Sequence, residues 1–426
     1  MASEEGIIIP ILPQEIIIEV LLRLPVKSLV KFRCVCKPWL SLISSPQFAK
    51  THLKISSEKN KGEHDRLVLG CTSDYGVFLR SINLDSFMHG KNFTDAAKVY
   101  GHEMDVNFPR VELRMIGSCN GLICISVGSC GVFLWNPSIR KSKVLPPSGS
   151  EFRNYSNTVT YGFGYDELND DYKVAENFGF ATDAYSFSAK LKIFSLRTNS
   201  WKEIENWPGA YPSRRRARTC AFVNGAFHWS GRPNGRWQIT SLNTETELYG
   251  EISLPEYEIG LKDLTLGVLR KCLCVFYNYK THLDIWMMKK YGVRESWTKL
   301  VCIMDIQDNV YQAPVPLYAS ESGIILMKYG STFKLYNSAD NNTSTFLEIS
   351  SPDPQSDYKA ITYTESLVLP NSDHEGNQHW RQWGTKDDDW DYQHLGSHGD
   401  LVDSAQQLYL TVDLTEMLKR ISIMIS

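Results

Sequence analysis

Four carboxylates gather in one short stretch of the sequence, and their spacing suits acid–base chemistry. Asp166, Glu167, Asp170 and Asp171 lie in GYDELNDDYKV. Paired carboxylates can serve as a general acid and a general base. Asp and Asn are also the residues that favour tight turns. The sequence therefore favours a solvated hairpin turn here over a catalytic pair.

Histidines give a second set of residues that could do chemistry. Zinc uses nitrogen ligands of this kind, and the candidates near the C-terminus are His374, His379, His394 and His398. They lie in a low-complexity stretch with no cysteine nearby, so we expect no metal site there. His228, in AFHWSG, alternates with aromatic residues and fits a packed core position. Because no phosphate-binding loop, nucleophile elbow or zinc-protease motif occurs, we expect no catalytic residue, cofactor or metal.

Arginines form the sharpest charge run, in PGAYPSRRRART, and they are our candidates for contact with a substrate: Arg214, Arg215, Arg216 and Arg218. Three interpretations stay open: a solvated loop, a basic surface for an acidic or phosphorylated partner, and a nuclear localisation signal. The chain carries no wider basic stripe, and its net charge is −3. We therefore expect no binding to nucleic acid.

Length and composition indicate a globular chain of more than one domain. It has 426 residues, of which 42% are hydrophobic and 12% aromatic. No apolar run is long enough for a membrane span, and the start MASEEG lacks the basic segment of a signal peptide. The ten cysteines include no C-x-x-C pair, which is typical of free thiols in a reducing compartment. We expect a cytoplasmic or nuclear protein, or one found in both, that binds no membrane.

The elements that would position a binding site begin with residues 7–53, the one apolar stretch that is helical and free of strand signals. Its spacing and its prolines predict three helices, beginning at Pro13, Lys27 and Pro38, with the second reaching about Cys36. So short a module cannot bury all of its apolar side chains, and the excess predicts a partner protein. The alternative is that the helices dock on the rest of this chain.

A diverged repeat follows. Strand, polar turn and strand recur, and the aligned anchor positions, 46 to 60 residues apart, are Leu79, Phe133, Ile193, Ile239, Ile285 and Phe333. Tight-turn signals recur in similar phase at Asn120-Gly121, Asn224-Gly225 and Ser322-Gly323. Four antiparallel strands per ~45 to 50 residues is typical of a β-propeller blade. We predict roughly six blades, with residues 360–370 as the strand that closes the ring; a β-sandwich or two smaller β domains are the alternatives.

The predicted organisation is therefore mainly β with an N-terminal module of three helices. Residues 1–54 form the helical module, 55–65 a linker, 66–370 the propeller and 371–426 an acidic, largely disordered tail.

The helical stretch LPQEIIIEVLLRLPVKSLVKFRCVCKPWLSLISSPQF resembles the F-box, with its two Leu-Pro pairs and its Val-Cys-Lys-x-Trp end. In that family the module binds a Skp-type adaptor, which links it to a cullin. The resemblance implies that the adaptor-contact residues are Leu12, Pro13, Pro25, Leu29, Val35, Cys36 and Trp39.

The repeat region looks like the F-box-associated domain of plant-type F-box proteins, related to kelch propellers, in GSCNGLICI, YGFGYDELNDDYKV and FVNGAFHW. A turn followed by Trp201 or Trp297 is kelch-like, although no Gly-Gly pair occurs. The resemblance implies a non-catalytic substrate receptor of a Skp-cullin-F-box ubiquitin ligase that recruits an unknown target protein. The alternatives are an interaction scaffold outside any ligase and a propeller enzyme.

Overall fold

The computed structural model describes residues 13–59, 65–73, 76–88, 102–104, 112–128, 131–150, 158–181, 187–205, 207, 220–232, 235–304, 314–330, 332–337, 344–347 and 358–371. The chain forms two compact units, whose described residues are 13–59 and 65–371. Among these residues, no helix combines the length and the apolar character that crossing a membrane requires.

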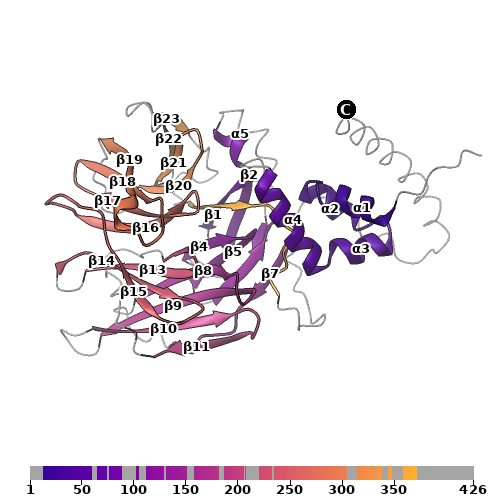
Figure 1. Ribbon diagram of the computed structural model, residues 1–426, viewed down its shortest axis with the longest axis horizontal. Coiled ribbons are helices and arrows are strands. Elements are labelled where there is room, and N and C mark those ends of the chain that lie inside the picture. The colour runs from indigo at the N-terminus through magenta and orange to yellow at the C-terminus, as the bar shows by residue number, and fades with distance from the viewer. Residues whose placement is uncertain are drawn as a thin grey trace, which may run out of the picture. The chain divides into compact units, whose positions relative to one another are not determined.

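Helices make up the described part of the first unit (Figure 1): α1 Gln14–Leu21, α2 Val26–Phe32, α3 Lys37–Ile43 and α4 Pro46–Lys59. Prolines stand at the first two N-caps, Pro13 and Pro25. The fixed φ of proline suits that place, and its missing N–H costs no helical hydrogen bond. The helices bury Leu21, Leu29 and Ile43 completely, so the apolar stripe predicted from the sequence does form a core.

The helices differ from the sequence prediction in one boundary and in one additional helix. The second helix ends at Phe32 rather than near Cys36, because Cys36 is extended (φ −158°, ψ 160°) as the N-cap of α3. Helix α4 was not predicted, and it occupies residues 55–59, where a polar linker was expected. The Ser45 hydroxyl caps it by accepting a hydrogen bond from the Phe48 N–H at 3.2 Å. Ser followed by Pro is a helix-start signal that could have revealed it.

Strands of the second unit form six four-stranded antiparallel sheets, the blades of a β-propeller (Figure 1). Blade 1 contains β24 (Lys359–Thr364), β1 (Asp65–Ser73), β2 (Gly76–Asn83) and β3 (His102–Met104). Blade 2 contains β4 (Leu113–Cys119), β5 (Leu122–Val127), β6 (Gly131–Asn136) and β7 (Lys141–Val144). Blade 3 contains β8 (Thr158–Asp166), β9 (Asp171–Ala181), β10 (Phe187–Ser195) and β11 (Ser200–Ile204). Blade 4 contains β12 (Ala221–Val223), β13 (Ala226–Gly231), β14 (Gln238–Asn243) and β15 (Tyr249–Ile252). Blade 5 contains β16 (Asp263–Leu269), β17 (Cys272–Asn278), β18 (His282–Met288) and β19 (Trp297–Met304). Blade 6 contains β20 (Val315–Ala319), β21 (Ile324–Tyr329), β22 (Thr332–Asn337) and β23 (Ser344–Leu347). A short helix, α5 (Leu84–Met88), follows β2, and a 3-10 helix, η3 (Arg294–Ser296), precedes β19.

The six anchor positions of the repeat occupy equivalent places in these blades. Each lies in the third strand of its sheet, namely β2, β6, β10, β14, β18 or β22. The fold class predicted from the sequence, with six blades behind an N-terminal helical module, is confirmed. The predicted acidic tail lies outside the described residues from residue 372 onward.

Ring closure joins the two ends of the second unit. Strand β24 pairs with β1 from Asp65↔Thr364 to Gly70↔Lys359, as the sequence predicted. Beyond β24, the buried Asn136 amide donates hydrogen bonds to the backbone oxygens of Ser366 (3.0 Å) and Val368 (2.7 Å). The closing segment is therefore bonded to blade 2 as well as to blade 1.

Tight turns explain why certain residue pairs recur between the first and second strands. Asn120-Gly121 (φ 53° and 83°) and Asn224-Gly225 (52° and 69°) have the positive φ values that a type I′ turn needs. Arg270-Lys271 adopts the same conformation (50° and 60°) without that signature. At Ser322-Gly323 only the glycine has a positive φ (94°), so this pair forms another kind of turn.

Two matched glycine substitutions test the contact between the turn at residues 120–121 and Ser366 of the closing segment. A Cβ at Gly121 would clash with the Ser366 hydroxyl oxygen, whereas one at Gly225 would meet no heavy atom within 4 Å. We expect Gly225→Ala to cost about 1–2 kcal/mol of unfolding free energy from its left-handed backbone. Gly121→Ala should cost roughly 1–3 kcal/mol more, because Ser366 must move and lose its hydrogen bonds. Chemical denaturation measures both values, and equal losses would contradict the contact.

Candidate functional site

The helical unit leaves several apolar side chains in contact with water. Ile16 and Leu40 are each 47% exposed, and Pro13 and Pro25 are exposed at the starts of their helices. Three of the predicted contact residues are half-buried: Val35, Cys36 and Trp39. Covering apolar surface releases about 25 cal/mol per Å². This arrangement therefore favours association with an apolar surface on another protein.

One predicted contact residue has no exposed surface in the structure. Leu29 is fully buried, because it lies on the inward face of α2 and belongs to the core of the helical unit. Leu12 lies outside the described residues. The sequence reasoning missed Leu40 and counted Ile16 only in the core stripe, since apolar residues at helical spacing fit a core and a contact surface equally well.

Trp39 contributes to both the core and the surface of the helical unit. Its ring lies 5.5 Å from that of Phe32, at 52°, which packs α3 against α2. The side chain nevertheless stays only half-buried. Substituting Trp39 would therefore change packing as well as contact area, and Leu40 beside it offers a cleaner probe of the surface.

The meander of each blade gives the propeller two distinct faces. Connections from first to second strand and from third to fourth lie at one face, which we call the turn face. The remaining connections, including those between blades, lie at the other, the loop face. Strand β1 is the second strand of blade 1 and β24 is the first. Residue 65 therefore begins β1 at the turn face, and β24 ends there at residue 364.

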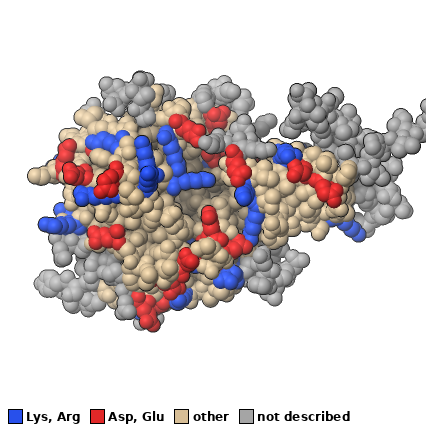
Figure 2. All heavy atoms as spheres, viewed as in Figure 1, with Lys and Arg blue, Asp and Glu red and all other residues tan. Residues whose placement is uncertain are grey.

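The predicted substrate residues Arg214, Arg215, Arg216 and Arg218 lie outside the described residues. The strands on either side, β11 and β12, are the last of blade 3 and the first of blade 4. They end and begin at the loop face. Figure 2 shows Lys and Arg interspersed with Asp and Glu over the visible face of the described residues, so neither sign covers it alone.

The carboxylate cluster forms the turn between β8 and β9, as expected, but two of its members are buried rather than solvated. Asp166 is 2% exposed and lies 2.7 Å from the Lys173 ammonium. Burial alone would raise the pKa of Asp166, but hydrogen bonds from Lys173 and Asn169 lower it. Asp171, also 2% exposed, accepts hydrogen bonds from the Ser195 hydroxyl and the Arg197 N–H. Both carboxylates are held by groups of their own blade, and the lowered pKa of Asp166 is the opposite of what a general acid needs.

His228 is a packed core residue, as the sequence predicted. It is fully buried, with Nδ1 3.2 Å from the Ala221 carbonyl oxygen and Nε2 2.8 Å from the Tyr291 hydroxyl. Burial lowers the pKa of His228 to about 4. The four histidines near the C-terminus lie outside the described residues.

Acidification should therefore weaken the propeller through His228. The unfolded chain takes up a proton near pH 6.5 while the folded chain resists until about pH 4, so this contribution to stability is complete above pH 6.5 and lost as the pH falls towards 4. At pH 5 the loss is about 2 kcal/mol. Unfolding free energies of wild type and His228→Gln at pH 7.5 and pH 5 measure it. The variant should lose less on acidification, and an equal loss would refute the assignment.

Two family models match the chain. One, described as the F-box associated beta propeller domain, matches residues 69–369, and the other, described as the F-box domain, matches residues 9–51. An F-box/kelch-repeat protein of Arabidopsis thaliana is 34% identical over 333 residues, covering 76% of this chain and 87% of that protein. The F-box protein CPR1 of the same species is 31% identical over 391 residues, covering 84% of this chain and 89% of that protein.

Proposed function

The chain belongs to the F-box proteins with an F-box-associated β-propeller, and from this premise we propose that it is the substrate-recognition subunit of a Skp-cullin-F-box ubiquitin ligase. The helices bind a Skp-type adaptor, and the adaptor connects them to a cullin. The propeller holds the target protein. Such a subunit acts in the cytoplasm, the nucleus or both.

The observation that carries this proposal is the uncovered apolar side chains of the helical unit. Ile16 and Leu40 lie on α1 and α3 with nearly half of their surface in water. A folded unit that exposes such groups is stabilised when a partner covers them. The F-box domain generally binds a Skp-type adaptor, and these side chains supply the apolar contact that such binding needs.

The receptor performs no bond chemistry in this mechanism. It holds the target close to a ubiquitin-charged enzyme carried elsewhere in the complex, which raises the effective concentration of the target's lysines. A rigid platform serves this purpose because a loosely held target would spread over a larger volume. The hydrogen-bonded ring of six sheets gives such a platform.

The target binds at the loop face in this proposal. The chain joins the propeller at residue 65 and completes the ring at residue 364, both at the turn face. Connections between blades lie at the loop face, and the described one over residues 253–262 is longer than the two-residue turns 120–121 and 270–271. Long connections tolerate change in sequence and commonly carry binding residues.

A scaffold outside any ligase is the second candidate, and co-purification separates the two. The scaffold predicts recovery of the adaptor without cullin, whereas the ligase subunit recovers both. A propeller enzyme receives no support from the described carboxylate cluster, whose buried members Asp166 and Asp171 are bonded within their own blade.

A charge on the exposed surface of α3 tests adaptor binding. Leu40→Asp should lower the affinity for a Skp-type adaptor at least tenfold, because burying an unpaired carboxylate costs about 2 kcal/mol or more. Calorimetric titration of the purified chain with adaptor measures the affinity, and circular dichroism checks that the helices are intact.

The neighbouring exposed polar residue gives a matched control. Ser41→Asp adds the same charge on the same helix without removing an apolar side chain, and it should bind within about threefold of wild type. Unchanged affinity of Leu40→Asp would argue against this surface as the adaptor contact.

A further inference from the structure

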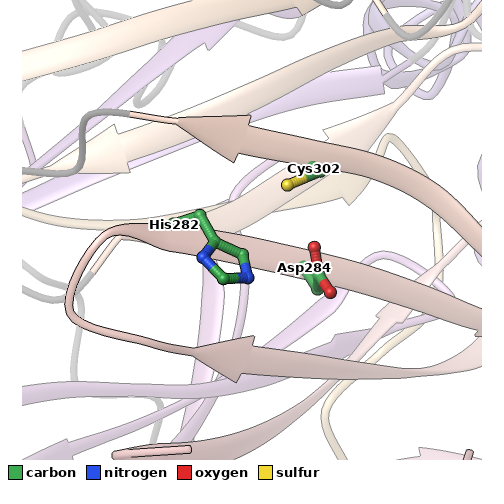
Figure 3. Close-up of side chains that lie close together, drawn as sticks. All are labelled: His282, Asp284 and Cys302. Carbon is green, nitrogen blue, oxygen red and sulfur yellow. The ribbon is translucent and has the colours of Figure 1, made fainter. Parts of the chain in front are cut away.

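Three side chains that suit a metal ion meet on two neighbouring strands of blade 5. His282 and Asp284 lie on β18 and Cys302 lies on β19, and their ligand atoms are all within 4.8 Å of one another (Figure 3). In the register of these strands Asp284 is directly opposite Cys302. Alternate residues of a strand point to the same face, and so do residues directly opposite in an antiparallel pair. The sheet geometry itself therefore brings the three together.

The carboxylate of Asp284 has a vacant coordination position. The residue is 3% exposed, and its Oδ1 has no N–H or O–H donor among the described residues. The weak donor beside the carboxylate is the Cys302 thiol, whose pKa is raised by burial and by its hydrogen bond with Asp284. The other oxygen, Oδ2, lies 2.6 Å from the Lys299 ammonium. A buried charged oxygen that has no strong donor is costly, and a bound cation that replaces the thiol proton would satisfy it.

The imidazole of His282 is held in a fixed orientation by its neighbours. Tyr279 stacks on it with the ring centroids 4.3 Å apart, and the Thr281 hydroxyl lies 2.9 Å from Nδ1. Metal-binding histidines commonly use one ring nitrogen for the metal and the other for an orienting hydrogen bond. This arrangement leaves Nε2 as the nitrogen that can bind an ion.

We propose that His282, Asp284 and Cys302 bind a zinc-class divalent cation through Nε2, Oδ1 and the thiolate sulfur. Zinc binds nitrogen, oxygen and sulfur ligands of these kinds, and in a tetrahedral site the ligand atoms stand about 3.5 Å apart. The ligand atoms must close by about 1 Å, and because His282 is held by its neighbours this movement falls to the side chain of the half-buried Cys302. Binding releases the thiol proton to solvent. The fourth position stays open to water.

Lys299 competes with the ion for Asp284. Its side chain is 40% exposed, and its ammonium lies 5.4 Å from the centroid of the Trp286 ring as well as against the carboxylate. In the metal-free chain this ammonium neutralises Asp284. A metal ion must approach the carboxylate from the Oδ1 side and bears the repulsion of the lysine. Removing the lysine charge should therefore strengthen metal binding.

Cobalt(II) gives the test a spectroscopic signature. Titration of metal-free full-length protein with Co²⁺ should produce a thiolate-to-cobalt charge-transfer band that saturates at one equivalent, and Zn²⁺ should abolish it by displacement. Cys302→Ser should remove the band. His282→Gln and Asp284→Asn should weaken binding at least about tenfold, since even outer-shell changes cost that much.

Two further variants distinguish this site from other metal-binding groups of the chain. Cys34→Ser removes an exposed thiol of the helical unit and should leave the band unchanged. Lys299→Met should raise the affinity for Co²⁺ several-fold. Cobalt bound only by histidines elsewhere would give no thiolate band. Absence of the band in wild type, or its persistence in Cys302→Ser, would overturn the proposal.

Discussion

The pairing of β24 with β1 is the contact on which the propeller depends. Successive residues of β1 point to opposite faces of blade 1, so Leu67 packs in an apolar cluster with Leu326 and Phe333 of blade 6, whereas Val68 packs in one with residues of blade 2. A single blade therefore has two apolar faces and cannot cover either alone. Closing the ring gives every face a neighbour, and the last strand of the chain supplies the first strand of the first blade.

A recurring hydrogen bond links the outer strands of neighbouring blades. The Trp201 and Trp297 indoles donate to the carbonyls of Pro146 (2.7 Å) and Ser253 (2.8 Å), each just after the fourth strand of the preceding blade. Between them along the chain, the Tyr249 hydroxyl donates to the Glu205 carbonyl in the same relation. These bonds satisfy carbonyls that a strand end would leave unpaired. They give a physical reason for the aromatic residue that follows the third-to-fourth turn.

Local signals in the sequence were sufficient for the blade pattern but not for contacts between distant residues. Asn-Gly pairs revealed two type I′ turns because positive φ restricts residue choice, while Arg270-Lys271 adopts such a turn with no signature. The inward direction of Leu29 depends on how the helices pack, and helical spacing alone does not give it. The meeting of Asp284 with Cys302 depends on strand register, which the sequence did not specify residue by residue.

The two faces of the propeller differ in how their polar groups are used. At the turn face, Asp171 joins the two turns of blade 3 through Ser195 and Arg197, and Lys173 extends to blade 4 by donating to the Thr244 carbonyl. Substituting such residues would loosen the ring itself. The loop-face connection 253–262 instead leaves Tyr257 and Ile259 exposed. The bonds from this connection to blade 5 use its backbone, namely the Ser253 and Pro255 carbonyls and the Glu258 N–H. Its side chains can therefore change without breaking those bonds, which is what a variable binding surface requires.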